Sequence, residues 1–127
     1  MRLDPYVSYA GHAFTLTREA LVDTMGTPLR SRRNAVELNE MDYGDVVLRF
    51  QDNGRLEEIT AEAPVLHIGP VAVPYARLQA FVLENDDRAF WRARFLVSPA
   101  YGIAFDPTEP AWVTALARHC LPQWEAL

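Results

Sequence analysis

Six carboxylates near the middle of the chain are the residues whose number and spacing best suit them to do chemistry. They fall between residues 37 and 62, where eight acidic residues stand against two arginines. This segment therefore carries a net charge of −6, while the whole chain carries −5. A local negative field attracts a basic partner and raises the rate of encounter. The sequence predicts a partner-binding acidic surface made of Glu37, Glu40, Asp42, Asp45, Glu57 and Glu58.

Paired carboxylates can also act as general acid and base, and Glu57 and Glu58 are neighbours in the sequence. Adjacent side chains of a β-strand point to opposite faces, so we expect these two carboxylates to be separated. We expect them instead to form a charged strand edge that hinders pairing with another chain. The acidic run at 84–87 lacks the residue order of a calcium loop and is interpreted as a solvated helix end.

His119 and Cys120 form the one neighbouring pair of histidine and cysteine. A nucleophilic cysteine needs a base within hydrogen-bond reach, whereas adjacent side chains point apart on a helix or a strand. We therefore expect Cys120 to be a small buried residue and no residue to be catalytic. The histidines at 12, 67 and 119 lack the spacing of zinc ligands, so no metal and no other cofactor is predicted.

Arg30, Arg32 and Arg33 form the one basic cluster of the chain. Together with Arg92 and Arg94 they could meet a phosphate or an acidic partner, and the alternative is a solvated loop. The negative net charge excludes a broadly basic nucleic-acid-binding protein. No apolar run approaches the roughly 20 residues of a membrane span, and the N-terminus has no signal-peptide pattern. With a single cysteine as well, the sequence favours a cytoplasmic protein with neither membrane nor nucleic acid as a partner.

Two helices are expected to position these groups. Thr17 is suited to cap a helix over residues 18–25, which Gly26 ends. The second helix begins after Pro74 and carries an apolar stripe as far as residue 84.

Strands are predicted from alternating apolar residues and turn signals. The Asn53-Gly54 turn is expected to join two of them in a hairpin, and the three-residue spacing of Leu56 and Ile59 predicts a bulge or an irregular edge. Residues 29–34 are expected to be a loop. Residues 111–117 fit both a strand and a helix, and we favour the strand. The other expected strands are 35–38, 45–50, 55–61, 65–68, 89–97 and 101–105.

The two halves of the chain, 14–62 and 71–120, follow one plan of helix, strand, Tyr-Gly strand and final strand. Tyr43-Gly44 of the first half corresponds to Tyr101-Gly102 of the second. A duplicated α-β-β unit and a coincidental order both explain this plan. In either case the sequence predicts one α+β domain over residues 1–127. We expect an antiparallel sheet of about 5–7 strands with two short helices on one face.

The stretch from Thr17 to Pro28 is a Thr-led helix that ends in an apolar-Gly-x-Pro corner before a β-meander. It resembles the β-lactamase inhibitor proteins and the outer-membrane assembly lipoproteins of the small-protein-A type, although Thr15 replaces the glycine expected before the helix. The hairpin from Phe50 to Ile59 gives the chain a likeness to small bacterial toxin-immunity proteins. These resemblances imply a bacterial, non-enzymatic immunity or inhibitor protein, which would hold a toxin or an enzyme with a basic surface.

Two other functions stay open at this point. One is a small-ligand-binding module whose pocket is lined by Trp91, Phe95, Tyr101 and Trp112. The other is an enzyme without a recognised motif.

Overall fold

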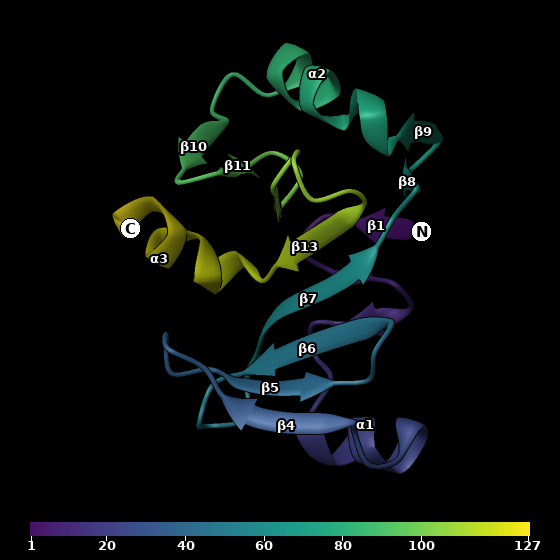
Figure 1. Ribbon diagram of the computed structural model, residues 1–127, viewed down its shortest axis with the longest axis vertical. Helices are drawn as coiled ribbons and strands as arrows, with labels where there is room; N and C mark the ends of the chain where they lie inside the picture. The colour runs from purple at the N-terminus through teal and green to yellow at the C-terminus, as the bar shows by residue number, and fades with distance from the viewer.

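The computed structural model describes residues 1–127 and shows an α+β protein with two sheets (Figure 1). The larger sheet is antiparallel throughout, in the order β10 (Phe90–Arg92), β11 (Phe95–Ser98), β12 (Ile103–Phe105), β13 (Trp112–Leu116), β7 (Leu56–Glu62), β6 (Val46–Phe50), β5 (Asn39–Asp42) and β4 (Arg30–Arg33). The smaller sheet has the order β3 (His12–Ala13), β2 (Ser8–Tyr9), β1 (Arg2–Asp4), β8 (Val65–Ile68) and β9 (Val71–Pro74). The structure thus has thirteen strands, more than expected, and most of them are short.

Both expected helices are present. Helix α1 (Arg18–Met25) begins as predicted, because Oγ1 of Thr17 accepts a hydrogen bond from the backbone N–H of Ala20 at 3.1 Å. Helix α2 (Tyr75–Asn85) follows Pro74. A third helix, α3 (Leu121–Ala126), follows the 3₁₀ turn η1 (Arg118–Cys120) and was not expected. The longest helix has 11 residues, and none of the three has the length and apolar character needed to cross a membrane.

Three strand predictions need correction. Residues 30–33 are a strand rather than a loop, and residues 35–38 are a turn rather than a strand, with Glu37 at a positive φ of 66°. The expected single strand over 89–97 is the β10–β11 hairpin, which folds back at Ala93 with φ 51°. Side chains alternate within each short strand, but Trp91 pairs with Leu96, so the alternation is offset across the turn and Trp91 and Phe95 lie on opposite faces. The turn was missed because Ala93 and Arg94 are not residues typical of a two-residue turn.

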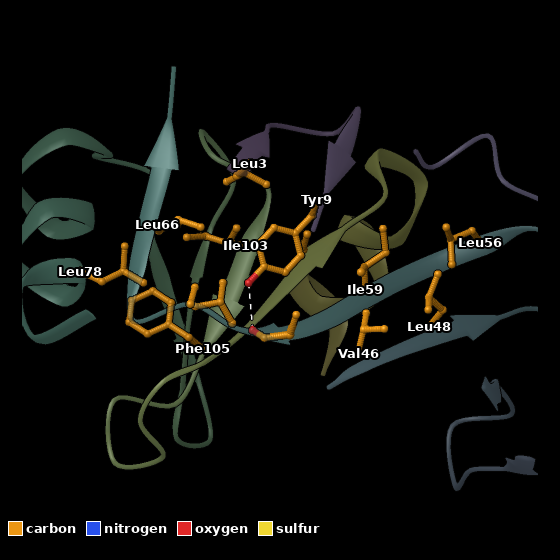
Figure 2. Packing of buried hydrophobic residues seen from close by; sticks show 14 of the residues in the cluster. Leu3, Tyr9, Val46, Leu48, Leu56, Ile59, Leu66, Leu78, Ile103 and Phe105 are labelled. Carbon is orange, nitrogen blue, oxygen red and sulfur yellow. Dashed lines mark hydrogen bonds between the residues drawn. The ribbon is translucent and has the colours of Figure 1, made fainter. Parts of the chain in front are cut away.

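The main core lies between the larger sheet and the elements on one of its faces. Leu21 of α1 and Leu78 of α2 belong to the same buried cluster as the sheet residues Leu48, Ile59 and Ile103. Figure 2 shows this packing, including the Tyr9 hydroxyl that donates a hydrogen bond to the backbone carbonyl of Ala61 at 2.9 Å. A strand of the small sheet is thereby fixed to the centre of the large one.

The strand order of the larger sheet follows the same pattern from either edge, with four consecutive strands leading to the centre. Each half of the chain contributes one helix and a meander of four strands, and the halves meet where β7 pairs with β13. Figure 1 shows β7 and β13 beside each other in the middle of the molecule, with α1 and α2 at opposite ends. This is the arrangement that two copies of one unit would produce. A duplication stays a prediction, with a unit of one helix and four strands instead of α-β-β.

Candidate functional site

The second face of the larger sheet is only partly covered. Leu121 and Trp124 of the α3 segment pack over a small cluster formed by Val97, Ala104 and Leu116. The remaining part, over β4, β5, β6, β7 and the start of β13, has no helix on it. We call this part the open face and define it by Arg32, Glu40, Arg49, Thr60, Trp112 and Thr114.

A chain of polar contacts crosses the open face from strand to strand. Glu40 accepts hydrogen bonds from Nε of Arg32 and Nε of Arg49, each at 2.8 Å. Nη1 of Arg49 donates to Oγ1 of Thr60 at 2.7 Å, and this hydroxyl lies 2.8 Å from Oγ1 of Thr114. The network therefore spans β4, β5, β6, β7 and β13, and it fixes the rotamers of polar side chains in a surface that stays accessible.

Glu40 is the anionic centre of this network, with only 9% of the residue exposed. Burial raises the pKa of its carboxyl, but the hydrogen bonds from Arg32, Arg49 and Asn34 outweigh burial and bring the pKa down to about 2. Glu40 is thus ionised at any physiological pH, and its charge is neutralised within the network.

A recess of about 440 Å³ lies on the open face at the junction of the two halves. Thr60, Thr114 and Arg49 of the network line it, together with the aromatic side chains Phe95 and Trp112. Its size falls in the range of pockets that bind small molecules.

The aromatic and charged groups around the recess are held by neighbouring side chains. The ring of Phe95 makes an edge-to-face contact with Trp124 of α3, with ring centroids 5.4 Å apart. Nε of Arg94 lies 3.7 Å from Oδ2 of Asp106. Of the four aromatic residues expected to line a pocket, Phe95 and Trp112 do so. Tyr101 instead packs against Phe81 of α2, and Trp91 is 45% exposed outside the recess.

Glu57 and Glu58 do not form the charged strand edge that was expected from the sequence. Strand β7 lies between β6 and β13, and its register shifts so that Phe50 faces Leu56 while Arg49 faces Glu58. Glu57 is the extra residue of this bulge, and a bulge was one of the two outcomes that the spacing of the apolar residues predicted. Because a bulge interrupts alternation, Glu58 faces Arg49 at 3.6 Å while Glu57 is completely buried, and both lie near Cys120.

These two carboxylates meet the segment between β13 and α3. Nε2 of His119 lies 2.8 Å from Oε2 of Glu57, although no hydrogen bond of good geometry forms between them. Nε1 of Trp124 donates to Oε2 of Glu58 at 3.2 Å, and Sγ of Cys120 lies 3.8 Å from the same oxygen. Burial raises the pKa of Glu58. Burial also raises the pKa of the Cys120 thiol, and the charges of Glu58 and Glu57 add to this effect. Cys120 is therefore a protonated, buried thiol without nucleophilic character.

The six acidic residues of the predicted surface do not form one exposed patch. Glu57 is inside the protein, Glu58 is mostly covered, and Glu40 is neutralised by arginines. Asp42 pairs with Arg30 at 3.1 Å. Only Glu37 and Asp45 are exposed without an ion pair, and they lie in the turns before and after β5. The reason is the register between β4 and β5, which sets basic residues directly opposite acidic ones.

The basic cluster is used in the same way. Besides the pairs of Arg30 and Arg32, Arg33 pairs with Asp52 at 2.9 Å. Arg92 donates to the backbone carbonyl of Glu125 at 2.6 Å, which ties β10 to α3. Three arginines next to eight acids in the sequence are a signal for internal pairing, but only the strand register shows which residues meet.

No group of three or more histidine, cysteine, aspartate or glutamate side chains is arranged to hold a metal ion. Comparison with family models, with curated proteins and with solved structures finds no match to this chain.

Proposed function

We propose that this protein is a non-enzymatic binding protein of the immunity or inhibitor type, and that it holds a protein partner with a basic surface against its open face. The observation that carries the proposal is that two exposed, unpaired glutamates lie next to Trp112. Glu62 lies directly opposite Trp112 in the strand register, and the backbone carbonyl of Glu109 accepts a hydrogen bond from the Trp112 N–H at 3.2 Å. Both glutamates are exposed and take part in no ion pair.

A tryptophan with two unpaired glutamates as neighbours suits a lysine or arginine side chain. The carboxylates attract the cation, and the indole ring offers a cation–π contact worth about 0.5–2 kcal/mol. Tryptophan and arginine are also the residues most enriched at the energetic centres of protein interfaces. Because the polar network holds the adjacent surface rigid, little side-chain entropy is lost on binding.

The experiment is a calorimetric titration with the protein encoded by the neighbouring gene. We expect the double reversal Glu62→Arg and Glu109→Arg to weaken the complex at least about tenfold and to remove most of its salt dependence. The matched control is Glu84→Arg and Asp87→Arg, an equal change of charge at the end of α2, which should stay within about twofold.

The acidic surface predicted from the sequence is tested by a separate variant in the same experiment. Glu37→Arg and Asp45→Arg reverse its two exposed, unpaired acids, and we expect a smaller loss because these residues lie at opposite ends of β5. A complex that withstands the reversal at Glu62 and Glu109 but fails with this variant would move the binding surface to the hairpin. Absence of any complex would contradict the proposal as a whole.

A further inference from the structure

The floor of the recess offers hydrogen-bond donors, while the carboxylates of its lining, Asp106 and Glu109, come from the segment between β12 and β13. Thr60 and Thr114 are joined by one hydrogen bond, in which either hydroxyl can be the donor. Two hydroxyl groups have two hydrogens, and a single bond between them uses one. One hydroxyl hydrogen therefore remains, and both residues line the recess.

Arg49 adds to this donor character. Its Nε is used by Glu40 and its Nη1 by Thr60, whereas its Nη2 takes part in no hydrogen bond. Guanidinium groups donate only, so a group that enters the recess beside Arg49 must accept. The carboxylate of Glu40 is not available to balance this, because it already accepts from three side chains.

The charges around the recess oppose an anionic occupant, and a cation has no acceptor for the free donors of the floor. Arg49 is paired with Glu40 and Glu58, Arg94 lies near Asp106, and Glu109 lines the recess without an ion pair. An anion would add a negative charge to a site whose positive charges are already paired, and this repulsion opposes the gain from hydrogen bonding. The aromatic walls, Phe95 and Trp112, favour a flat ring, which can stack or meet them edge to face.

We infer that this recess is a binding site for a small, neutral, planar molecule that carries a hydrogen-bond acceptor, of the class of aromatic carboxamides. The ring lies against Phe95 and Trp112, and the carbonyl oxygen accepts from the free threonine hydroxyl and from Nη2 of Arg49. The volume of about 440 Å³ lies within the range of pockets that bind small molecules. The inference does not rest on the protein partner proposed above.

Nicotinamide and nicotinate are a matched pair of probes, since they share one ring and differ in charge. The three tryptophans each give one indole N–H resonance in a ¹H–¹⁵N spectrum, and single Trp→Phe variants assign them. We expect nicotinamide to shift the Trp112 resonance saturably, with a dissociation constant of about millimolar order, and to leave that of Trp91 unchanged. Nicotinate is expected to bind at least about fivefold more weakly.

Valine substitutions test the floor without changing its shape. Thr60→Val or Thr114→Val alone leaves one hydroxyl with its hydrogen, so each single variant should bind nicotinamide within about threefold of the unchanged protein. The double variant has no hydroxyl and should bind about three- to tenfold more weakly than either single variant, which corresponds to one lost hydrogen bond.

Three results would overturn the inference: no saturable shift of Trp112, nicotinate binding as tight as nicotinamide, or an unchanged affinity in the double variant. Far-ultraviolet circular dichroism establishes that each variant is folded. Added salt separates this site from the protein surface, because a complex held by charges weakens with salt while that of a neutral probe does not.

Discussion

Glu40 shows how a carboxylate can be buried and still stabilise the protein. An ionised carboxylate in the interior is unfavourable unless hydrogen bonds replace its water. Here two arginines and one asparagine supply them. The sequence shows Glu40 as one of many acids, and nothing in its local pattern separates it from the exposed Glu37. The difference comes from β4, whose register sets Arg32 opposite Glu40.

We expect Glu40→Gln to lower the free energy of unfolding by about 2 kcal/mol near neutral pH, as for other hydrogen bonds to charged groups. The pKa of Glu40 in the folded protein is about 2, below its ordinary value of 4.5. The stabilisation is therefore complete above pH 4.5 and is lost as the pH falls from 4.5 towards 2. Urea unfolding of both proteins at about pH 7 and about pH 2.5 measures this difference.

The control for this measurement is Asp52→Asn. Asp52 also pairs with an arginine, but both side chains are at least half exposed, so the substitution should leave the urea midpoint close to that of the unchanged protein at both pH values. An effect of Glu40→Gln that is equally large at both pH values would mean that the lost contribution is packing and not charge.

Among the elements, the β7 bulge separates what the sequence could and could not predict. The irregular spacing of Leu56 and Ile59 predicted either a bulge or an irregular edge, and the register shows that it is a bulge. The expected separation of Glu57 and Glu58 was wrong, because alternation was assumed at the one place where a bulge interrupts it. Helix α3 was missed for a different reason. It has six residues and no side-chain N-cap, so its position depends on packing against β13 and β11 rather than on local signals.

The β10–β11 hairpin offers a direct test of turn chemistry. Its two-residue turn has a positive φ at Ala93 and not at Arg94, a pattern that favours glycine at the first position. We expect Ala93→Gly to raise the free energy of unfolding by about 0.5–1 kcal/mol, since glycine adopts this φ without steric cost. Chemical denaturation measures the change.

Ala80→Gly is the matched control, because the same substitution is made at an exposed position inside α2. There glycine should destabilise by about 1 kcal/mol. If both variants shift in the same direction, backbone strain at Ala93 does not govern the stability of the hairpin.

At the scale of the whole molecule, the order of helices and strands in the two halves was largely predictable, and the strand number was not. The matched Tyr-Gly strands and final strands occupy equivalent places on the two sides of the β7–β13 pair. The recess could not be predicted, because its floor joins Thr60 and Thr114, 54 residues apart in the chain. Only the pairing of β7 with β13 brings these hydroxyls together.

The third helix is the one cover on the second face, and Cys120 reports whether it is docked. The thiol is buried and protonated, so we expect its reaction with a disulfide reagent such as dithiobis(nitrobenzoate) to be slow in the folded protein. Trp124→Ala removes the contacts with Phe95 and Glu58 and should speed this reaction at least about tenfold through local opening. Absorbance of the released thiolate follows the rate.

Trp91→Ala serves as the comparison, since Trp91 is exposed and distant from Glu58 in the sheet order; its reaction rate should stay within about twofold of the unchanged protein. Rapid labelling of the unchanged protein would show that α3 does not hold Cys120 away from solvent.

Helix α3 covers only one side of the second face of the larger sheet. The two equivalent halves of the sheet therefore have different surroundings on that face. Paired residues run across all eight strands in the order Arg30, Asp42, Val47, Thr60, Thr114, Ala104, Val97 and Phe90. The centre of this row is symmetric, because Thr60 faces Thr114. One end of the row is an ion pair in contact with water, and the other is an apolar cluster beneath α3. A half-turn about the β7–β13 junction would therefore exchange two different environments, the ion pair and the apolar cluster. A molecule that binds across the β7–β13 junction therefore has one preferred orientation. The backbone alone would allow two equivalent orientations, and the different side chains on the two sides select one of them.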